Sequence, residues 1–139
     1  MSVQSGPNDP RESGNYTFLI RDQADGPQQL PLDHLLNRVL AVSGRRTGLL
    51  WRVTNARGYG VEVCQLEDSL EEKESVVVEP DRLIQIARDK TQWFYDLHCV
   101  DDLLPLFFGL QDSTALYVRG SEALCRKVSA SFHNVTLVV

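Results

Sequence analysis

Residues 93–139, WFYDLHCVDDLLPLFFGLQDSTALYVRGSEALCRKVSASFHNVTLVV, hold most of the strongly apolar sequence and decide the fold. The first seven are rich in aromatic residues and alternate in character, which is typical of a strand over residues 93–99. One side of that strand would carry Trp93, Tyr95, Leu97 and Cys99. Over the whole stretch, the pattern predicts strand, helix, strand, helix and strand in that order.

A short helix is expected over residues 103–108, which are almost entirely leucine and phenylalanine. Asp101 and Asp102 precede it, and a carboxylate at the N-cap accepts hydrogen bonds from free helix N–H groups. If Asp102 is the cap, Pro105 falls in the first turn, and Gly109 is a natural end for the helix. Neighbouring carboxylates can also act in acid–base chemistry, but capping accounts for Asp101 and Asp102 more simply.

The remainder of this stretch predicts a strand over residues 114–118, a helix capped by Ser121, and a last strand over residues 135–139. The helix carries an apolar residue at every fourth position, a spacing typical of a face packed on a core, at Leu124, Val128 and Phe132. Because an exposed edge of wholly apolar composition invites aggregation, the last strand is expected inside the sheet.

Upstream, residues 1–14 are rich in Ser, Gly, Pro, Asn and Asp and predict a flexible tail, while residues 15–139 predict one domain. The expected strands are residues 15–21, 48–54, 61–66 and 75–79. Turn residues 55–60 would join the second and third of these into a hairpin. A helix is expected over residues 32–42, where the pairs Leu35/Leu36 and Val39/Leu40 repeat at helical spacing, with its end near Ser43-Gly44. Another helix is expected from Pro80 onward.

This order predicts an α+β fold, a single mixed sheet with helices packed on it. Residues 15–99 follow the strand-helix-strand-strand-helix-strand order of a ferredoxin-like sandwich with one added strand. The C-terminal stretch then adds a βαβαβ-like extension.

The chain has 139 residues and a net charge of −5. A nonspecific nucleic-acid binder needs a basic face to neutralise phosphates, so the acidic balance argues against a nucleic-acid partner and favours a basic protein partner. No apolar run is long enough to span a membrane, and the N-terminus lacks the apolar core of a secretory signal. We therefore expect a cytoplasmic protein without a membrane partner.

The acidic run at residues 67–74 supplies the candidate partner-binding residues Glu67, Asp68, Glu71, Glu72 and Glu74. Such a run is typical of a solvated loop, and the alternative is a recognition surface.

No motif for catalysis, metal binding or cofactor binding is present, and neither a metal nor a cofactor is expected. Gly58-Tyr59-Gly60 lacks the third glycine and the helix of a phosphate-binding loop. Cys64, Cys99 and Cys125 are too widely spaced for a metal site and fit reduced core thiols. An enzyme is therefore the less favoured interpretation.

Three functional hypotheses follow. The leading one is a noncatalytic protein-interaction module that neutralises a basic partner such as a toxin, as immunity and inhibitor proteins do. The alternative is a small-molecule-binding regulatory domain or a small enzyme, with a pocket between sheet and helices near His98 and Tyr117. The third is a homodimer that pairs through the C-terminal strand.

Overall fold

The computed structural model describes residues 15–24, 28–44 and 46–138 of the chain. Across these residues, seven strands form one sheet in the order β3-β2-β4-β5-β6-β1-β7, and every neighbouring pair is antiparallel. The strands are β1 (Tyr16–Ile20), β2 (Trp51–Tyr59), β3 (Val76–Val78), β4 (Trp93–Asp101), β5 (Leu106–Gln111), β6 (Ala115–Gly120) and β7 (Val135–Val138). The helices are α1 (Leu32–Ser43), α2 (Val61–Glu72), α3 (Pro80–Arg88) and α4 (Glu122–Ser129).

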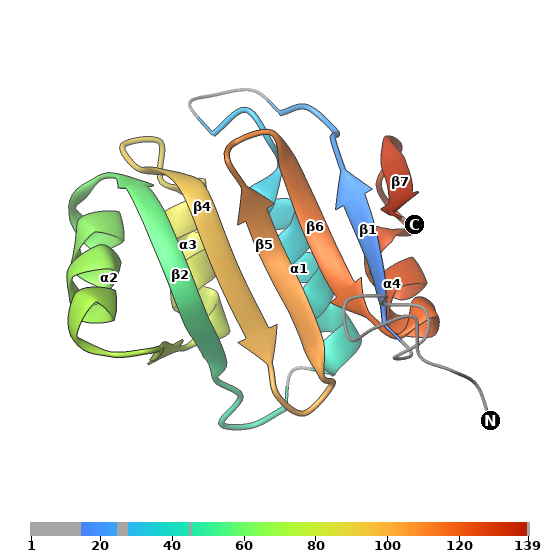
Figure 1. Cartoon of the computed structure of the whole chain (residues 1–139), viewed down its shortest axis with the longest axis horizontal. Coiled ribbons are helices and arrows are strands. Elements are labelled where there is room, and N and C mark those ends of the chain that lie inside the picture. The colour runs from blue at the N-terminus through green and yellow to red at the C-terminus, as the bar shows by residue number, and fades with distance from the viewer. Residues whose placement is uncertain (1–14, 25–27, 45, 139) are drawn as a thin grey trace, which may run out of the picture.

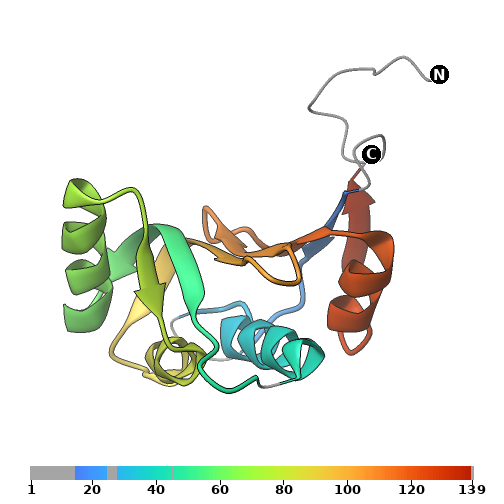
Figure 2. The same ribbon diagram turned by 90° about the horizontal axis from the view of Figure 1, so that it is seen from below.

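Helices α1 and α3 lie side by side on one face of the sheet, as Figures 1 and 2 show from two directions. Helix α4 packs against α1 and against β1 and β6, whereas α2 stands beyond β2 at the opposite end of the molecule. The core fills the space between the sheet and the helices, where the Trp51 and Phe108 rings meet edge to face with centroids 4.8 Å apart. The other face of the central strands carries no helix (Figure 2).

Helix α1 confirms the expected helix and its end. Four of its apolar residues are buried at the predicted spacing, namely Leu35, Leu36, Val39 and Leu40. Gly44 follows with a φ of +80°, a left-handed conformation that glycine adopts without a Cβ clash and that ends the helix. Two other helices start as predicted: Pro80 is the first residue of α3, and the Ser121 hydroxyl accepts a hydrogen bond from the Leu124 N–H of α4.

The helix expected over residues 103–108 is wrong, because β4 and β5 form a hairpin there. Asp101 is nevertheless a cap: its Oδ1 accepts hydrogen bonds from the N–H groups of Leu103 and Leu104 in the connecting turn. A tight turn leaves the same free N–H groups as a helix start, so the two have one sequence pattern. The buried Asp101 carboxylate also binds Arg46, at 3.1 and 3.2 Å.

The hairpin expected over residues 48–66 is also wrong. Strand β2 continues through residues 55–59, and residues 61–72 form α2. Val61 and Val63 alternate with polar residues as a strand would, but the Glu- and Leu-rich sequence that follows favours a helix. The predicted acidic loop is therefore largely helical.

The sheet itself differs from the expected one. It is antiparallel and not mixed, the ferredoxin-like strand order is not confirmed, and β4, β5 and β6 follow one another without the helix crossover that a βαβαβ extension needs. Strand β7 lies at the edge beside β1, not inside the sheet, with Leu137 and Val138 exposed. Its four residues make it short, which limits edge-to-edge association. Dimerisation through β7 stays a prediction, and the predicted tail, residues 1–14, lies outside the described residues.

Asp101 and Asp102 offer a matched test of the buried ion pair. Asp101 is 1% exposed, whereas Asp102 is exposed and pairs with Arg52 on the surface. Asp101→Ala leaves turn N–H groups and an arginine without their acceptor, so the free energy of unfolding should fall by about 3–5 kcal/mol. Asp102→Ala should change it little. Urea unfolding of both variants measures the difference, and equal midpoints would contradict this role of Asp101.

Two glycines with positive φ allow a second comparison. A Cβ on Gly109, at φ +155°, would collide with the Leu97 carbonyl oxygen on β4, whereas a Cβ on Gly44 meets only open space. Gly44→Ala should cost about 1 kcal/mol for the left-handed backbone alone. Gly109→Ala should cost more than about 3 kcal/mol, because two strands must also separate. Thermal and urea unfolding compare them, and a smaller loss for Gly109→Ala would refute the close approach.

Candidate functional site

Helix α2 is attached to the sheet edge by polar contacts at its first turn. It follows Gly60, where any Cβ would collide with the side chain of Gln92. The Gln92 Oε1 accepts hydrogen bonds from the N–H groups of Glu62 and Val63, at 2.8 and 3.1 Å. The Gln92 amide nitrogen donates to the carboxylates of Glu62 and Asp89. The buried Gln92 side chain thus caps the helix in place of an N-cap residue.

The candidate partner-binding residues do not all face solvent. Asp68, Glu71, Glu72 and Glu74 are exposed, and no ion pair joins them to another described residue. Glu67 is half-buried, and its Oε1 accepts a hydrogen bond from the Gly58 N–H of β2 at 2.8 Å. Glu67 therefore holds α2 against β2, while the other four carboxylates remain available to a partner.

An open groove runs along the start of α2, with a volume of about 830 Å³. Tyr59 and Val61 supply apolar surface to it and are 55% and 73% exposed. The Tyr59 ring stacks on Trp93 with centroids 4.4 Å apart, which fixes its orientation. Asp68 and Asp89 also line the groove, so it combines aromatic and acidic surface. The sequence predicted a turn at residues 55–60, so this groove was not expected.

The structure brings His98 and Tyr117 together, with His98 Nδ1 2.7 Å from Tyr117 Oη. They line a cavity of about 270 Å³ with Thr17, Phe107, Gln111 and Arg119. The expected place of this pocket is wrong, because the two side chains lie on the sheet face away from the helices. Their strand neighbours Leu97 and Val118 point into the core instead.

Burial lowers the pKa of His98, and this effect outweighs the nearby carboxylates of Asp96 and Asp112, which act in the opposite direction. Burial also raises the pKa of the Tyr117 hydroxyl. Both groups are therefore neutral near pH 7, and each can donate or accept a hydrogen bond.

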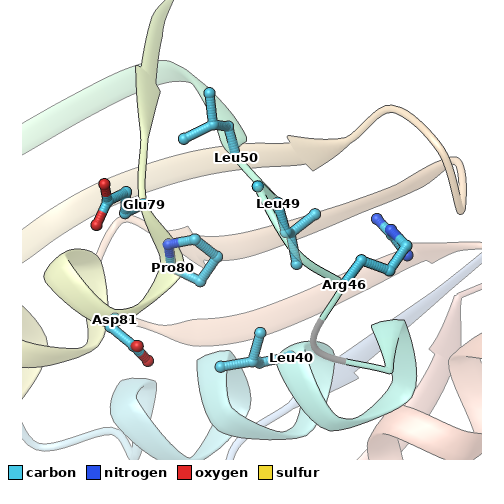
Figure 3. A pocket seen from close by; sticks show the side chains of 8 residues that line it. Leu40, Arg46, Leu49, Leu50, Glu79, Pro80 and Asp81 are labelled. Atoms are coloured by element: carbon cyan, nitrogen blue, oxygen red, sulfur yellow. The ribbon is translucent and has the colours of Figure 1, made fainter.

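A different pocket lies between the helices and the sheet, where residues of α1, α3 and the segment before β2 meet (Figure 3). It measures about 340 Å³ and is walled by Leu40, Leu49 and Pro80, with Glu79 and Asp81 at its α3 side. Arg46, its cation, is already bound to Asp101 and to the Ser43 carbonyl oxygen. Among the described residues, this pocket therefore presents no free cation to a ligand.

All three cysteines are free thiols, and two of them are buried as expected. Burial raises the pKa of the Cys99 thiol far above its ordinary value and that of Cys125 to about 11, which makes both poor nucleophiles. Cys64 is exposed on α2, so its assignment to the core is wrong. In the part of the chain that the structure describes, no cluster of His, Cys, Asp or Glu is suited to a metal ion.

Comparison with protein-family models, curated proteins and solved structures found no match for the chain. Among the described helices, none combines the length and apolar character needed to cross a membrane.

The lowered pKa of His98 predicts how the stability of the protein changes with pH. As pH falls below about 6.5, the unfolded chain takes up the His98 proton before the folded protein does. Between the unfolded and the folded pKa of His98, the free energy of unfolding therefore decreases as the pH falls. The free energy of unfolding should therefore fall less steeply with acid in His98→Gln than in the wild type. Urea unfolding at several pH values tests this. An NMR titration midpoint above 6.5 for the His98 ring would contradict it.

Proposed function

We propose that the protein is a noncatalytic interaction module that binds a basic protein partner through α2 and the adjoining groove. Immunity and inhibitor proteins that neutralise a basic toxin are the class that this proposal favours. The observation that carries it is the segregation of charge. Residues 61–74 contain six acids and one lysine, a net charge of −5, and the rest of the chain has 13 acidic and 13 basic residues.

The packing of α2 supports the same proposal. Within its twelve residues, Val63 alone is fully buried, and Leu66 and Leu70 pack against the core only in part. These three side chains form a narrow apolar stripe on the helix. Hydrogen bonds that Gln92 and Glu67 accept from backbone N–H groups complete its attachment, and the exposed carboxylates are left turned to solvent.

The groove supplies apolar contact surface, which charge alone does not provide. Charged surfaces mainly accelerate association and select partners, whereas affinity comes from buried anchors. A lysine or arginine side chain of the partner can place its aliphatic stem along Tyr59 and Val61 and its cationic head beside Asp68 or Asp89. The Tyr59–Trp93 stack holds this surface in one orientation before the partner arrives.

Two charge-matched variants test the proposal. The first neutralises Asp68, Glu71, Glu72 and Glu74 with Asn or Gln and keeps Glu67, because Glu67 holds the helix. The control makes the same changes at four acids outside α2 and reaches the same net charge, at Glu79, Asp81, Asp102 and Glu122. The partner is isolated from native lysate with the wild type at physiological salt, and its association rate is measured with all three proteins at two salt concentrations.

We expect the α2 variant to associate about tenfold or more slowly at low salt and to show a flatter salt dependence, with a smaller change in dissociation. The control variant should stay close to the wild type. Equal rates and equal salt slopes for the two variants would remove α2 from the interface. Recovery of no protein partner under these conditions would refute the interaction function itself.

A further inference from the structure

The helix-free face of the sheet carries a second site that α2 does not use. Strands β4, β5 and β6 place His98, Gly109 and Tyr117 opposite one another in adjacent positions. Because Gly109 has no side chain, the His98 and Tyr117 side chains meet across it and form their 2.7 Å hydrogen bond. The cavity is therefore produced by a gap in the middle of the sheet surface, with rigid strands on both sides.

Arg119 gives this cavity a positive charge. It lies beside Phe107 on β5 and Thr17 on β1 in the strand pairing, and all three line the cavity. Its Nε is buried and has no hydrogen-bond partner among the described residues, and no described carboxylate lies within ion-pair distance. Two other arginines of this face, Arg52 and Arg57, are by contrast ion-paired, with Asp102 and Asp96.

The two carboxylates that influence His98 do not line the cavity. Asp96 and Asp112 favour the protonated form of the His98 ring, but neither is a lining residue. The buried Asp96 carboxylate accepts a hydrogen bond from the Asp112 N–H and pairs with Arg57. The Arg119 guanidinium therefore has no carboxylate partner among the described residues, and a ligand carboxylate can take that place.

The other cavity residues define the size and shape of the ligand. Gln111 and Thr17 add neutral hydrogen-bonding groups, and the half-exposed Phe107 ring adds a flat apolar wall. A volume of about 270 Å³ is near the lower end for ligand pockets, which are roughly 300–1,000 Å³. A planar carboxylate can accept two parallel hydrogen bonds from one guanidinium, a geometry that a spherical anion does not match.

We propose that this cavity binds a small monocarboxylate with a flat apolar body, its carboxylate on Arg119 and Tyr117 and its body against Phe107. The site is separate from α2, and the proposal does not depend on the interaction function. A ligand there would join β1, β4, β5 and β6 at the centre of the sheet.

Sodium benzoate is the probe, because it has this shape and charge, and benzamide is its neutral counterpart. Each is titrated into the full-length protein to about 20 mM at constant ionic strength, and amide and arginine side-chain NMR signals are followed. We expect saturable shifts at Gly109, Tyr117 and Arg119 with benzoate, with a dissociation constant of about 10 mM or tighter. Benzamide should bind at least about tenfold more weakly.

Arg119→Gln should weaken benzoate binding by at least about tenfold, since the charged hydrogen bonds are lost. Arg52→Gln is the matched control: it removes one positive charge from the same sheet face but does not line the cavity, and it should bind as the wild type does. If Arg119→Gln does not fold, Tyr117→Phe replaces it and should also bind more weakly. The absence of saturable shifts, equal binding of benzamide, or equal weakening by Arg52→Gln would each overturn the proposal.

Discussion

A glycine on each neighbouring strand packs closely against β4. Any other residue at either position would push the backbone of β4 away. A Cβ on Gly58 of β2 would collide with the Trp93 carbonyl oxygen, and one on Gly109 of β5 with that of Leu97. Both positions adjoin a candidate site. The Gly58 N–H binds Glu67 and so positions α2, and Gly109 opens the space in which His98 and Tyr117 meet. The same close packing around β4 thus produces the groove at one edge and the cavity at the centre.

The two faces of the sheet differ in composition and in what they contribute. The face under α1, α3 and α4 holds the core, including Trp51, Phe94 and Phe108, and supplies the stability. The opposite face is polar and aromatic, and its arginines are ion-paired where they adjoin Asp96 and Asp102. Antiparallel sheets commonly show this division, which leaves one surface free to change without loss of the fold.

The sequence predicted what depends on neighbouring residues and failed where distant contacts decide. The leucine spacing and Gly44 were sufficient for α1, as were Pro80 for α3 and Ser121 for α4. Asp101 and Asp102 together were expected to supply a cap for free N–H groups, and Asp101 does so, but one sequence pattern fits both a helix start and a turn. The pairing of β4 with β5 distinguishes the two, and Asp101 then also reaches Arg46, 55 positions away. The apolar β7 was assigned to the interior because composition alone does not show which strand is last in a sheet.

The candidate sites show the same limit. The exposed acids of α2 could be read from the sequence, but the special position of Glu67 depends on Gly58 of another element. His98 and Tyr117 were expected near one pocket, although between the sheet and the helices, and their hydrogen bond was not predicted. Arg119 was not expected there, because no local signal marks an arginine that lacks a carboxylate partner.

Because the net charge resides in one helix at the end of the molecule, the negative charge of the protein is displaced towards that end. The field of a nearby basic surface would attract the whole molecule and also exert a torque on it. At physiological ionic strength such a field is screened over roughly 8 Å. Over that last distance the torque would turn α2 towards a basic partner of the kind proposed, so that a larger fraction of collisions would begin with α2 facing the partner.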